Sequence, residues 1–428
     1  MKLNSLSTNR IFIVGAVLFI YITFAFQSIS NTKGQFAYID FASFYAGAKA
    51  TFIQNTSPYS QKVINEYKDE MGVDQIYPYL YPPPSLFVFY PLSKLSFENS
   101  KWLAFIVNHL LLVGIYLTLL PLITKNFGTA TYLPIIIFTV YFFSYDPIIN
   151  TFTIGQSNLI LLFCLSSIWW LISRDSKSKI SDIGIGLLLS ITILLKLYPA
   201  ILLLFFLFKR DFKVVIFATV FTLLFSFISL MILPAGIWQD WINVMLAKAA
   251  IGENAIDFVS PGFPWNISVS AFFSRLFSVN NWTRPLINAP MIGTTLTYLV
   301  SIALVTAVLW KSYKLKSSYK TESINAEFGL YLLTMFLIAP VSWGHHLAFI
   351  LPAIIITVGY LIKENPVPKT VLMITGSVIV IGLKIPYWSS VLYSPALNWA
   401  ISIKMFAIVL LWFYLLTKTK LNDTNIAY

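Results

Sequence analysis

The sequence has little charge, little histidine and almost no cysteine. Only 11% of the 428 residues are charged and 57% are hydrophobic, whereas soluble domains carry roughly 25% charged residues. Cys164, the single cysteine, lies in an apolar run, so neither a disulfide nor a metal site made of several cysteines can form within one chain. The composition predicts an all-α protein that crosses a membrane many times.

Two patterns that handle nucleotides are absent from the basic loops between the apolar runs. These loops contain neither a glycine-rich phosphate loop nor an Asp-x-Asp pair for a metal–nucleotide complex. The net charge of +12 comes from short Lys and Arg clusters between apolar runs, which is typical of cytoplasmic loops rather than of a nucleic-acid-binding surface. We therefore expect no nucleic-acid partner.

The basic clusters predict the topology, because Lys and Arg near the ends of spans favour the cytoplasm. The number of crossings between consecutive clusters must then be even. Residues 85–95 (SLFVFYPLSKL) hold too short an apolar run for a spanning helix, which needs roughly 17–25 residues, so we expect an interfacial segment there. The first apolar run follows Lys2 and Arg10 and is expected to be a retained first span.

This parity predicts one integral membrane domain over residues 1–428, with about twelve spans and both termini inside. Large outer loops are expected over about 28–100 and 235–290, and the C-terminal spans over about 346–416. The run 183–208 must cross twice, and its turn is expected at KLYP, since proline breaks a helix. Lys196 is thus placed at the outer tip of this pair of helices or part-way down.

Six polar segments fall on the outer side in this topology. They are Asp40, residues 77–85 (YPYLYPPPS), residues 145–158 (YDPIINTFTIGQSN), Lys196, residues 261–277 (PGFPWNISVSAFFSRLF) and residues 342–346 (SWGHH). An enzyme built in this way would have its site facing outward, where soluble nucleotides are scarce.

Asp40 precedes a stretch with helical apolar spacing, and two interpretations follow. Residues 41–53 repeat aromatic and alanine residues at helical intervals, which predicts an amphipathic helix lying on the membrane surface with Asp40 as its N-cap. Carboxylates next to membranes are also often functional. The two roles are compatible, and the residues alone do not separate them.

Lys196 and Arg275 are cations with apolar neighbours. Each side chain either snorkels to the membrane interface or binds an anion. Arg275 would bind a phosphate through its planar guanidinium, and Lys196 would bind it as a point charge. His345 and His346 are adjacent, so on a helix they would point about 100° apart, which disfavours a shared metal. They would hydrogen-bond a substrate, act as acid or base, or form a satisfied polar pair.

The remaining polar residues have structural as well as binding interpretations. Gln156 and Asn158 either complete helix ends or bind hydroxyl groups. The tyrosines of residues 77–85 either anchor a stiff connector at the interface or line a sugar or lipid groove. Asp146 is either a second functional carboxylate or a turn residue, and His109, in an apolar span, is expected to be structural.

Several short motifs follow Asp40 in a fixed order up to residue 347. They are SPY (57–59), YPPPS (81–85), PLSKL (91–95), GQSN (155–158), KLYP (196–199), NISVSAFFSRLF (266–277) and SWGHH (342–346). In this order they resemble glycosyltransferase family 87, membrane-embedded enzymes of GT-C fold exemplified by polyprenyl-phosphomannose-dependent α-1,2-mannosyltransferases.

The resemblance implies transfer of a hexose, typically mannose, from a polyprenyl-phosphate donor to a glycolipid or glycan acceptor, with inversion. It places the reaction at the outer face of the cytoplasmic membrane and requires neither cofactor nor metal. Asp40 is then the catalytic base. Contacts with the donor phosphate or the substrates are expected from Lys196, Arg275, His345, His346, Gln156, Asn158, Tyr59, Tyr81 and Asn266.

Two other classes of protein compete with this interpretation. A transporter or flippase of lipid-linked saccharides would use the same aromatic and cationic groove without forming bonds. A membrane acyltransferase would normally place its histidine near a cytoplasmic thioester donor, and the outward position predicted for SWGHH argues against it.

Overall fold

The computed structural model describes residues 2–32, 38–127, 132–174, 178–248, 260–315, 321–387 and 397–419. In these residues the chain is helical. The helices are α1 (Lys2–Asn31), α2 (Ile39–Phe52), α3 (Gln61–Asn65), α4 (Lys68–Met71), η1 (Pro83–Ser85), α5 (Leu86–Ser93), α6 (Phe97–Phe127), α7 (Leu133–Ser144), α8 (Asp146–Ile154), α9 (Asn158–Ile172), α10 (Lys179–Leu195), η2 (Tyr198–Ile201), α11 (Leu202–Phe208), α12 (Phe212–Ile232), α13 (Ile237–Lys248), α14 (Val269–Phe277), α15 (Pro290–Lys314), α16 (Thr321–Ile338), η3 (Gly344–Ile350), α17 (Leu351–Glu364), α18 (Pro368–Gly382), α19 (Asn398–Ile401) and α20 (Ile403–Lys418).

Six segments of the described chain are long and apolar enough to cross a membrane, which makes this a multi-pass membrane protein. Several shorter apolar helices lie among them, including α9 and α18. The six are Phe12–Asn31, Phe97–Lys125, Leu133–Ile154, Phe212–Ile232, Pro290–Lys314 and Gly344–Glu364.

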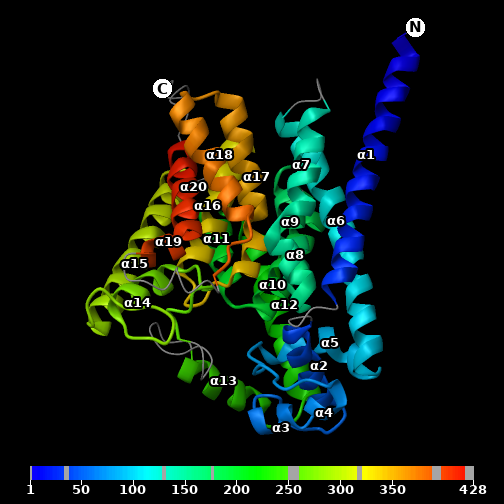
Figure 1. Cartoon of the computed structure of the whole chain (residues 1–428), viewed down its shortest axis with the longest axis vertical. Coiled ribbons are helices and arrows are strands. Elements are labelled where there is room, and N and C mark those ends of the chain that lie inside the picture. Colours follow the sequence, from blue (N-terminus) through cyan, green and yellow to red (C-terminus); the bar gives the residue numbers. More distant parts are fainter. Residues whose placement is uncertain are drawn as a thin grey trace.

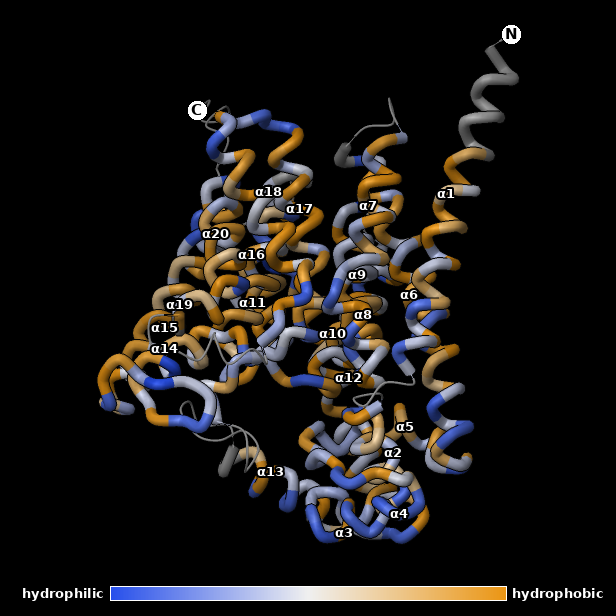
Figure 2. Tube along the Cα trace, viewed as in Figure 1, coloured by the Kyte–Doolittle hydropathy of each residue, from blue (hydrophilic) through white to orange (hydrophobic). Residues whose placement is uncertain are grey.

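The molecule has a bundle of long helices and a more polar part at one end of it. Figure 1 shows α2 to α5 and α13 gathered at the end of the bundle that lies away from both chain termini. Figure 2 shows that this end carries more hydrophilic residues than the bundle. The first and second predicted outer loops also touch there, because the indole Nε1 of Trp241 in α13 donates to the carbonyl of Leu80 at 3.4 Å.

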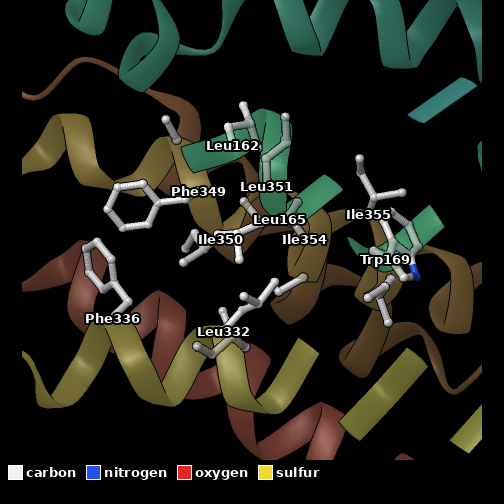
Figure 3. Close-up of a cluster of buried hydrophobic side chains, with 14 of the residues drawn as sticks. Leu162, Leu165, Trp169, Leu332, Phe336, Phe349, Ile350, Leu351, Ile354 and Ile355 are labelled. Atoms are coloured by element: carbon white, nitrogen blue, oxygen red, sulfur yellow. The ribbon is translucent and has the colours of Figure 1, made fainter. Parts of the chain in front are cut away.

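The centre of the bundle is a dry apolar core formed by helices that are far apart in sequence. Figure 3 shows side chains of α9, α16, η3 and α17 meeting there, among them Leu165, Leu332 and Ile354, each of which is at most 1% exposed. The indole of Trp169 donates from Nε1 to Oδ1 of Asn325 at 3.0 Å, so its one polar atom is satisfied within the core. This core fixes η3, and with it the paired histidines, against α9.

The predicted helix after Asp40 exists, but its predicted position on the membrane surface is wrong. Ten of the 14 residues of α2 are buried, on all of its faces. Phe44 stacks on Phe89 of α5 with 4.2 Å between the ring centroids. A Cβ at Gly47 would lie 2.8 Å from Cδ2 of Tyr79, so the helix touches the aromatic loop directly. Helix α2 is therefore a core element of the polar end.

The break predicted at KLYP is confirmed. Helix α10 ends at Leu195, and Lys196 has extended backbone angles (φ −149°, ψ 130°) before the 3-10 helix η2 begins at Tyr198. Residues 85–95 form only the eight-residue helix α5, which packs against α2 and is far too short to span a bilayer. The proline-containing segments thus interrupt the bundle where the sequence predicts.

Candidate active site

The end of α8 docks on the start of α2, and this contact positions Asp40. Gly155 ends α8 with φ +70°, and a Cβ there would lie 2.6 Å from Cβ of Phe41 and 2.8 Å from Cδ1 of Tyr38. The amide of Tyr38 donates to the carbonyl of Thr153 at 2.8 Å. Only glycine allows both the left-handed backbone and this close approach.

Asp40 lies in the first turn of α2 and is not its N-cap, so the predicted capping role is wrong. The cap residue is Tyr38, whose backbone is left-handed (φ 60°) and whose side chain makes no capping bond. The Asp40 carboxylate instead accepts a hydrogen bond at Oδ2 from Nε2 of Gln156, at 2.9 Å. The partly exposed Asp40 side chain therefore faces the GQSN segment.

The orientation of the Gln156 amide is fixed from both sides. The amide of Ser157 donates to Oε1 of Gln156 at 3.0 Å, and the Tyr81 hydroxyl lies 3.1 Å from Oε1 and 3.0 Å from Nε2 of the same amide. Because Oε1 accepts from the Ser157 amide, the NH₂ group faces Asp40. The Tyr59 hydroxyl donates to the carbonyl of Tyr81 at 2.6 Å and so holds the tyrosine backbone in place.

Burial raises the pKa of the Asp40 carboxyl to about 6, against the opposing effects of the Gln156 hydrogen bond and the positive charge of Lys196. Burial removes water from the carboxylate and disfavours its charged form. A carboxylate with such a pKa is a stronger base than an ordinary aspartate and is still ionised at neutral pH.

Lys196 is buried, with 7% of its surface exposed, next to the amide and tyrosine of the Asp40 cluster. Its Nζ donates to Oδ1 of Asn158 at 3.1 Å and lies 2.6 Å from Nε2 of His346. The same ammonium lies 5.9 Å from the ring centroid of Tyr81 and 5.5 Å from that of Phe349. Tyr81 thus touches both the amide that binds Asp40 and the cation.

The two histidines are held differently. His346 Nδ1 accepts from the backbone amide of Trp343 at 3.3 Å, while its Nε2 faces Lys196. The His345 ring lies 4.6 Å from that of His346 at 84°, and the Asn158 amide donates to the His345 carbonyl at 3.2 Å. Nε2 of His345 is buried and makes no hydrogen bond within the described part of the chain.

Asn266 joins the second outer loop to the SWGHH segment. Its Oδ1 accepts from the amides of Ser342 at 2.9 Å and Ser268 at 3.2 Å, and a β-bridge pairs Asn266 with Trp343. Arg275 is fully buried, and its guanidinium donates to the carbonyls of Phe263 and Asn266, at 3.2 and 3.0 Å, and to Ser402 Oγ at 2.8 Å.

The structure therefore brings together most, but not all, of the predicted site residues. Tyr59, Tyr81, Gln156, Asn158, Lys196 and the two histidines connect to Asp40 by the contacts above. Asn266 braces the backbone next to the histidines, and Arg275 sits in that loop and does not snorkel to the surface. A contact of Arg275 with donor phosphate stays a prediction.

Asp146 lies at the other end of α8 from the GQSN segment. Lys404 and Lys384 are close enough to Asp146 to interact electrostatically with it. Lys404 is 1% exposed and was missed by the sequence patterns, because it is a single charge at the start of an apolar helix. Tyr198, in KLYP, was also missed, although its motif points to it.

His109 has the structural role predicted for it. Its Nδ1 lies 3.1 Å from the Tyr21 hydroxyl and its Nε2 lies 3.2 Å from Ser28 Oγ, so both ring nitrogens are bonded between α1 and α6. Among the described residues, no three His, Cys, Asp or Glu side chains converge in a way that could hold a metal ion.

Comparison with characterised proteins finds similar mannosyltransferases. The chain is 24% identical over 214 residues to the polyprenol-phosphate-mannose-dependent alpha-(1-2)-phosphatidylinositol mannoside mannosyltransferase of Mycobacterium tuberculosis, which covers 49% of this chain and 43% of the relative. It is 23% identical over 254 residues to the protein of the same name from Mycolicibacterium smegmatis, covering 58% and 51%.

A third relative, from another strain of M. tuberculosis, is a polyprenol-phosphate-mannose-dependent alpha-(1-2)-phosphatidylinositol pentamannoside mannosyltransferase, 23% identical over 295 residues, with 68% of this chain and 60% of the relative covered. The matches thus span about half the length of the first two relatives. The sequence model described as Glycosyltransferase family 87 matches residues 79–340, well over half of the chain, and this range contains the Tyr81, Gln156, Asn158 and Lys196 described above. The protein belongs to glycosyltransferase family 87.

Proposed function

We propose that this protein is a membrane glycosyltransferase that moves a mannosyl group from a polyprenyl-phosphate donor to a glycolipid or glycan acceptor, with inversion at the sugar. We further propose a GT-C fold with about twelve membrane crossings, and a site on the outer face of the cytoplasmic membrane. One observation carries the proposal: Tyr81 contacts both the partly buried cluster of Asp40 and Gln156 and the buried cluster around Lys196.

The choice of substrates rests on the relatives. Their names specify polyprenol-phosphate-mannose dependence and phosphatidylinositol mannoside acceptors. A lipid-linked donor agrees with a site at the end of a membrane bundle, because donor and protein then share the bilayer. We take mannose as the sugar and a glycolipid as the first acceptor class to test.

The Asp40 cluster supplies the base in this proposal. The acceptor hydroxyl attacks the anomeric carbon while Asp40 takes its proton, and the bond from that carbon to the phosphate oxygen breaks. A single displacement from the face opposite the phosphate inverts the anomeric configuration. General base catalysis of this kind typically contributes about 10²- to 10⁴-fold. Gln156 holds the carboxylate so that its free oxygen can face the hydroxyl.

The Lys196 cluster binds the leaving group. The electron pair of the broken bond leaves with the polyprenyl phosphate, which gains negative charge in the transition state. A desolvated ammonium aimed at that charge is worth far more than one in water. Lys196 meets this condition because it is buried and its contacts are with neutral groups, Asn158 and His346.

Replacement of Asp40 tests the proposal. In membranes supplied with labelled polyprenyl-phosphomannose and a glycolipid acceptor, the wild type should attach label covalently to the acceptor, and Asp40→Asn should lose at least about 10²-fold of this rate. Asp69→Asn, a change at an exposed aspartate of α4, is the matched control and should retain full activity.

Substantial turnover by Asp40→Asn would remove Asp40 as the base. If label crosses to the other leaflet without becoming attached to an acceptor, the protein is a flippase of lipid-linked saccharides and not a transferase.

A further inference from the structure

The polar groups around Lys196 divide into a saturated set and an unsatisfied set. Both ring nitrogens of His346 are occupied: the Trp343 amide donates to Nδ1 at 3.3 Å, and Nε2 lies 2.6 Å from Nζ of Lys196. A neutral imidazole has one lone pair and can accept from only one of these two donors, and neither ring nitrogen is left for a substrate. Asn158 is similarly engaged, with Oδ1 bonded to Lys196 and its NH₂ bonded to Thr151 and the His345 carbonyl.

Two polar atoms beside these residues have no partner. The hydroxyl of Tyr198 and Nε2 of His345 are both buried, and neither makes a hydrogen bond within the described residues. His345 as a whole is 8% exposed. Buried polar groups are nearly always hydrogen-bonded, because a lost bond to water must be replaced, so each unsatisfied group in a native site calls for a ligand or a cost in stability.

Both atoms belong to side chains that surround the contact between Lys196 and His346. The Tyr198 ring lies 6.4 Å from the ring of His346 and 5.7 Å from that of Phe349, and the His345 ring lies 4.6 Å from that of His346. Tyr198 is also close enough to Tyr81 to interact with it electrostatically. The Tyr198 ring thus lies beside two of the groups around Lys196, His346 and Phe349.

The local backbone explains why Tyr198 can reach this position. The chain leaves α10 at Lys196 and turns into η2, with Pro199 directly after Tyr198. One residue separates Lys196 from Tyr198 along the chain, so both side chains are presented by the same break. Leu197, between them, is 44% exposed and provides an apolar surface next to the break.

The chemistry of this set fits one kind of ligand. A phenol hydroxyl and an imidazole N–H are donors, and with an ammonium they form a set of three donors that suits an anion. Phosphate oxygens take hydrogen bonds from charged and neutral donors, and such bonds are stronger than those to neutral acceptors. A sugar hydroxyl would not require three donors and a cation.

We propose that the Tyr198 hydroxyl and the Nε2–H of His345 bind the phosphate of the lipid-linked donor, with Lys196 providing the charge. His346 is a positioning residue that holds Lys196 and does not contact the donor. This assignment rests on the proposed function, because it takes the donor to be a lipid phosphate, and it gives the two adjacent histidines different roles.

The test uses the purified full-length protein and two readouts: steady-state kinetics with polyprenyl-phosphomannose, and equilibrium binding of polyprenyl phosphate, the product. Tyr198→Phe removes only a hydroxyl. It should raise the donor KM and weaken polyprenyl phosphate binding by roughly tenfold or more, as expected for loss of a hydrogen bond to a charged group, and leave the acceptor KM unchanged.

Tyr116→Phe is the matched control, because the Tyr116 hydroxyl is buried but lies 2.7 Å from Thr139 Oγ1, its partner. It should leave polyprenyl phosphate binding unchanged and lower the melting temperature. Tyr198→Phe should not lower the melting temperature of the ligand-free protein, since no bond is lost there.

His345 is tested in the same way. His345→Gln, whose amide can present an N–H near the position of Nε2, should retain more polyprenyl phosphate binding than His345→Leu. Wild-type binding of polyprenyl phosphate by Tyr198→Phe would overturn the proposal even if Asp40→Asn is inactive. Weakened binding in a protein that shows no transferase activity would sustain the phosphate site and overturn the proposed function instead.

Discussion

Two buried lysines of this bundle differ in the partners of their positive charge. Lys209 follows α11 and forms an ion pair with Glu327 of α16, and the two side chains are 1% and 0% exposed. Lys196 precedes η2, the 3-10 helix that leads into α11, and its hydrogen-bond partners are neutral, Asn158 and His346. Only about a dozen residues of chain separate the two lysines.

Lys209 is a structural charge, whereas the surroundings of Lys196 leave its charge available to bind an anion. An ion pair whose members are both buried is complete in itself, and removing one member leaves the other uncompensated. A buried ammonium that is hydrogen-bonded only to neutral groups, with its nearest influential carboxylate, Asp40, not in direct contact, can still bind a phosphate. Replacement of Lys196 should therefore reduce catalysis, whereas replacement of Lys209 should reduce the stability of the fold.

The largest expected effect is on catalysis at Lys196. Lys196→Met should lower kcat for mannosyl transfer by about 10²- to 10³-fold, because a charge-stabilising donor to the leaving group is lost. The amount of folded protein in detergent should remain near that of the wild type, since Lys196 is hydrogen-bonded only to neutral groups and forms no direct ion pair with Asp40. Transfer at the wild-type rate in a membrane assay would contradict a role for Lys196 in the reaction.

The next effect is on stability at Lys209. Lys209→Met should destabilise the protein by about 3 to 5 kcal/mol, because Glu327 is left buried and unpaired. Thermal unfolding of the detergent-solubilised protein measures this loss. The double change Lys209→Met with Glu327→Leu should recover much of the stability, and if it does not, the pair matters for more than charge compensation. The residual folded protein should transfer mannose at an ordinary rate.

The smallest effect concerns the pH dependence of the Asp40 cluster. Asp40 accepts a proton only when it is ionised, and its pKa is raised to about 6, chiefly by burial, so kcat should reach half its plateau near pH 6 and fall further in acid. Gln156→Ala removes a hydrogen bond that lowers this pKa. The pKa should then rise, and the acid limb of the pH–rate profile should move to higher pH.

Gln239→Ala, at an exposed glutamine of α13, serves as the control and should leave the profile in place. An unchanged acid limb in Gln156→Ala would mean that Gln156 does not bond Asp40 during turnover. Such a result would confine the role of Gln156 to the structure of the α8–α9 turn.

Much of the site could be predicted from the sequence where a break in helical order coincides with polar residues. Proline in KLYP excludes a continuous helix, so α10 had to end next to Lys196. Gly155 and Gln156 form a helix end for a similar reason, since Gly155 adopts a left-handed backbone. These are local effects, and local sequence determines them.

The position of α2 could not be predicted from its aromatic stripe alone. The opposite face carries small residues, among them Ala42, Ala46 and Ala50, which let other segments pack closely against it. A stripe of large apolar residues is compatible with a membrane surface or with a protein core, and only the tertiary contacts with Phe89 and Tyr79 decide between them. The loss of the N-cap role of Asp40 follows from the same packing.

The separate roles of the two histidines were equally inaccessible to sequence reasoning. Their adjacency disfavours a shared metal but does not say which ring turns toward Lys196. That choice depends on the Trp343 amide, which is fixed by Asn266 from a loop about 75 residues away along the chain. Hydrogen bonds between distant segments of this kind leave no periodic signal.

Because Gly155 has no side chain, it also affects how the site can move. Helix α8 meets the Phe41 and Tyr38 side chains of the α2 end there with no side chain of its own, which brings Gln156 close enough to bond Asp40. Lipid-facing surfaces of the bundle can therefore change in sequence, or tilt with the thickness of the bilayer, while the proton acceptor and its amide move as one piece.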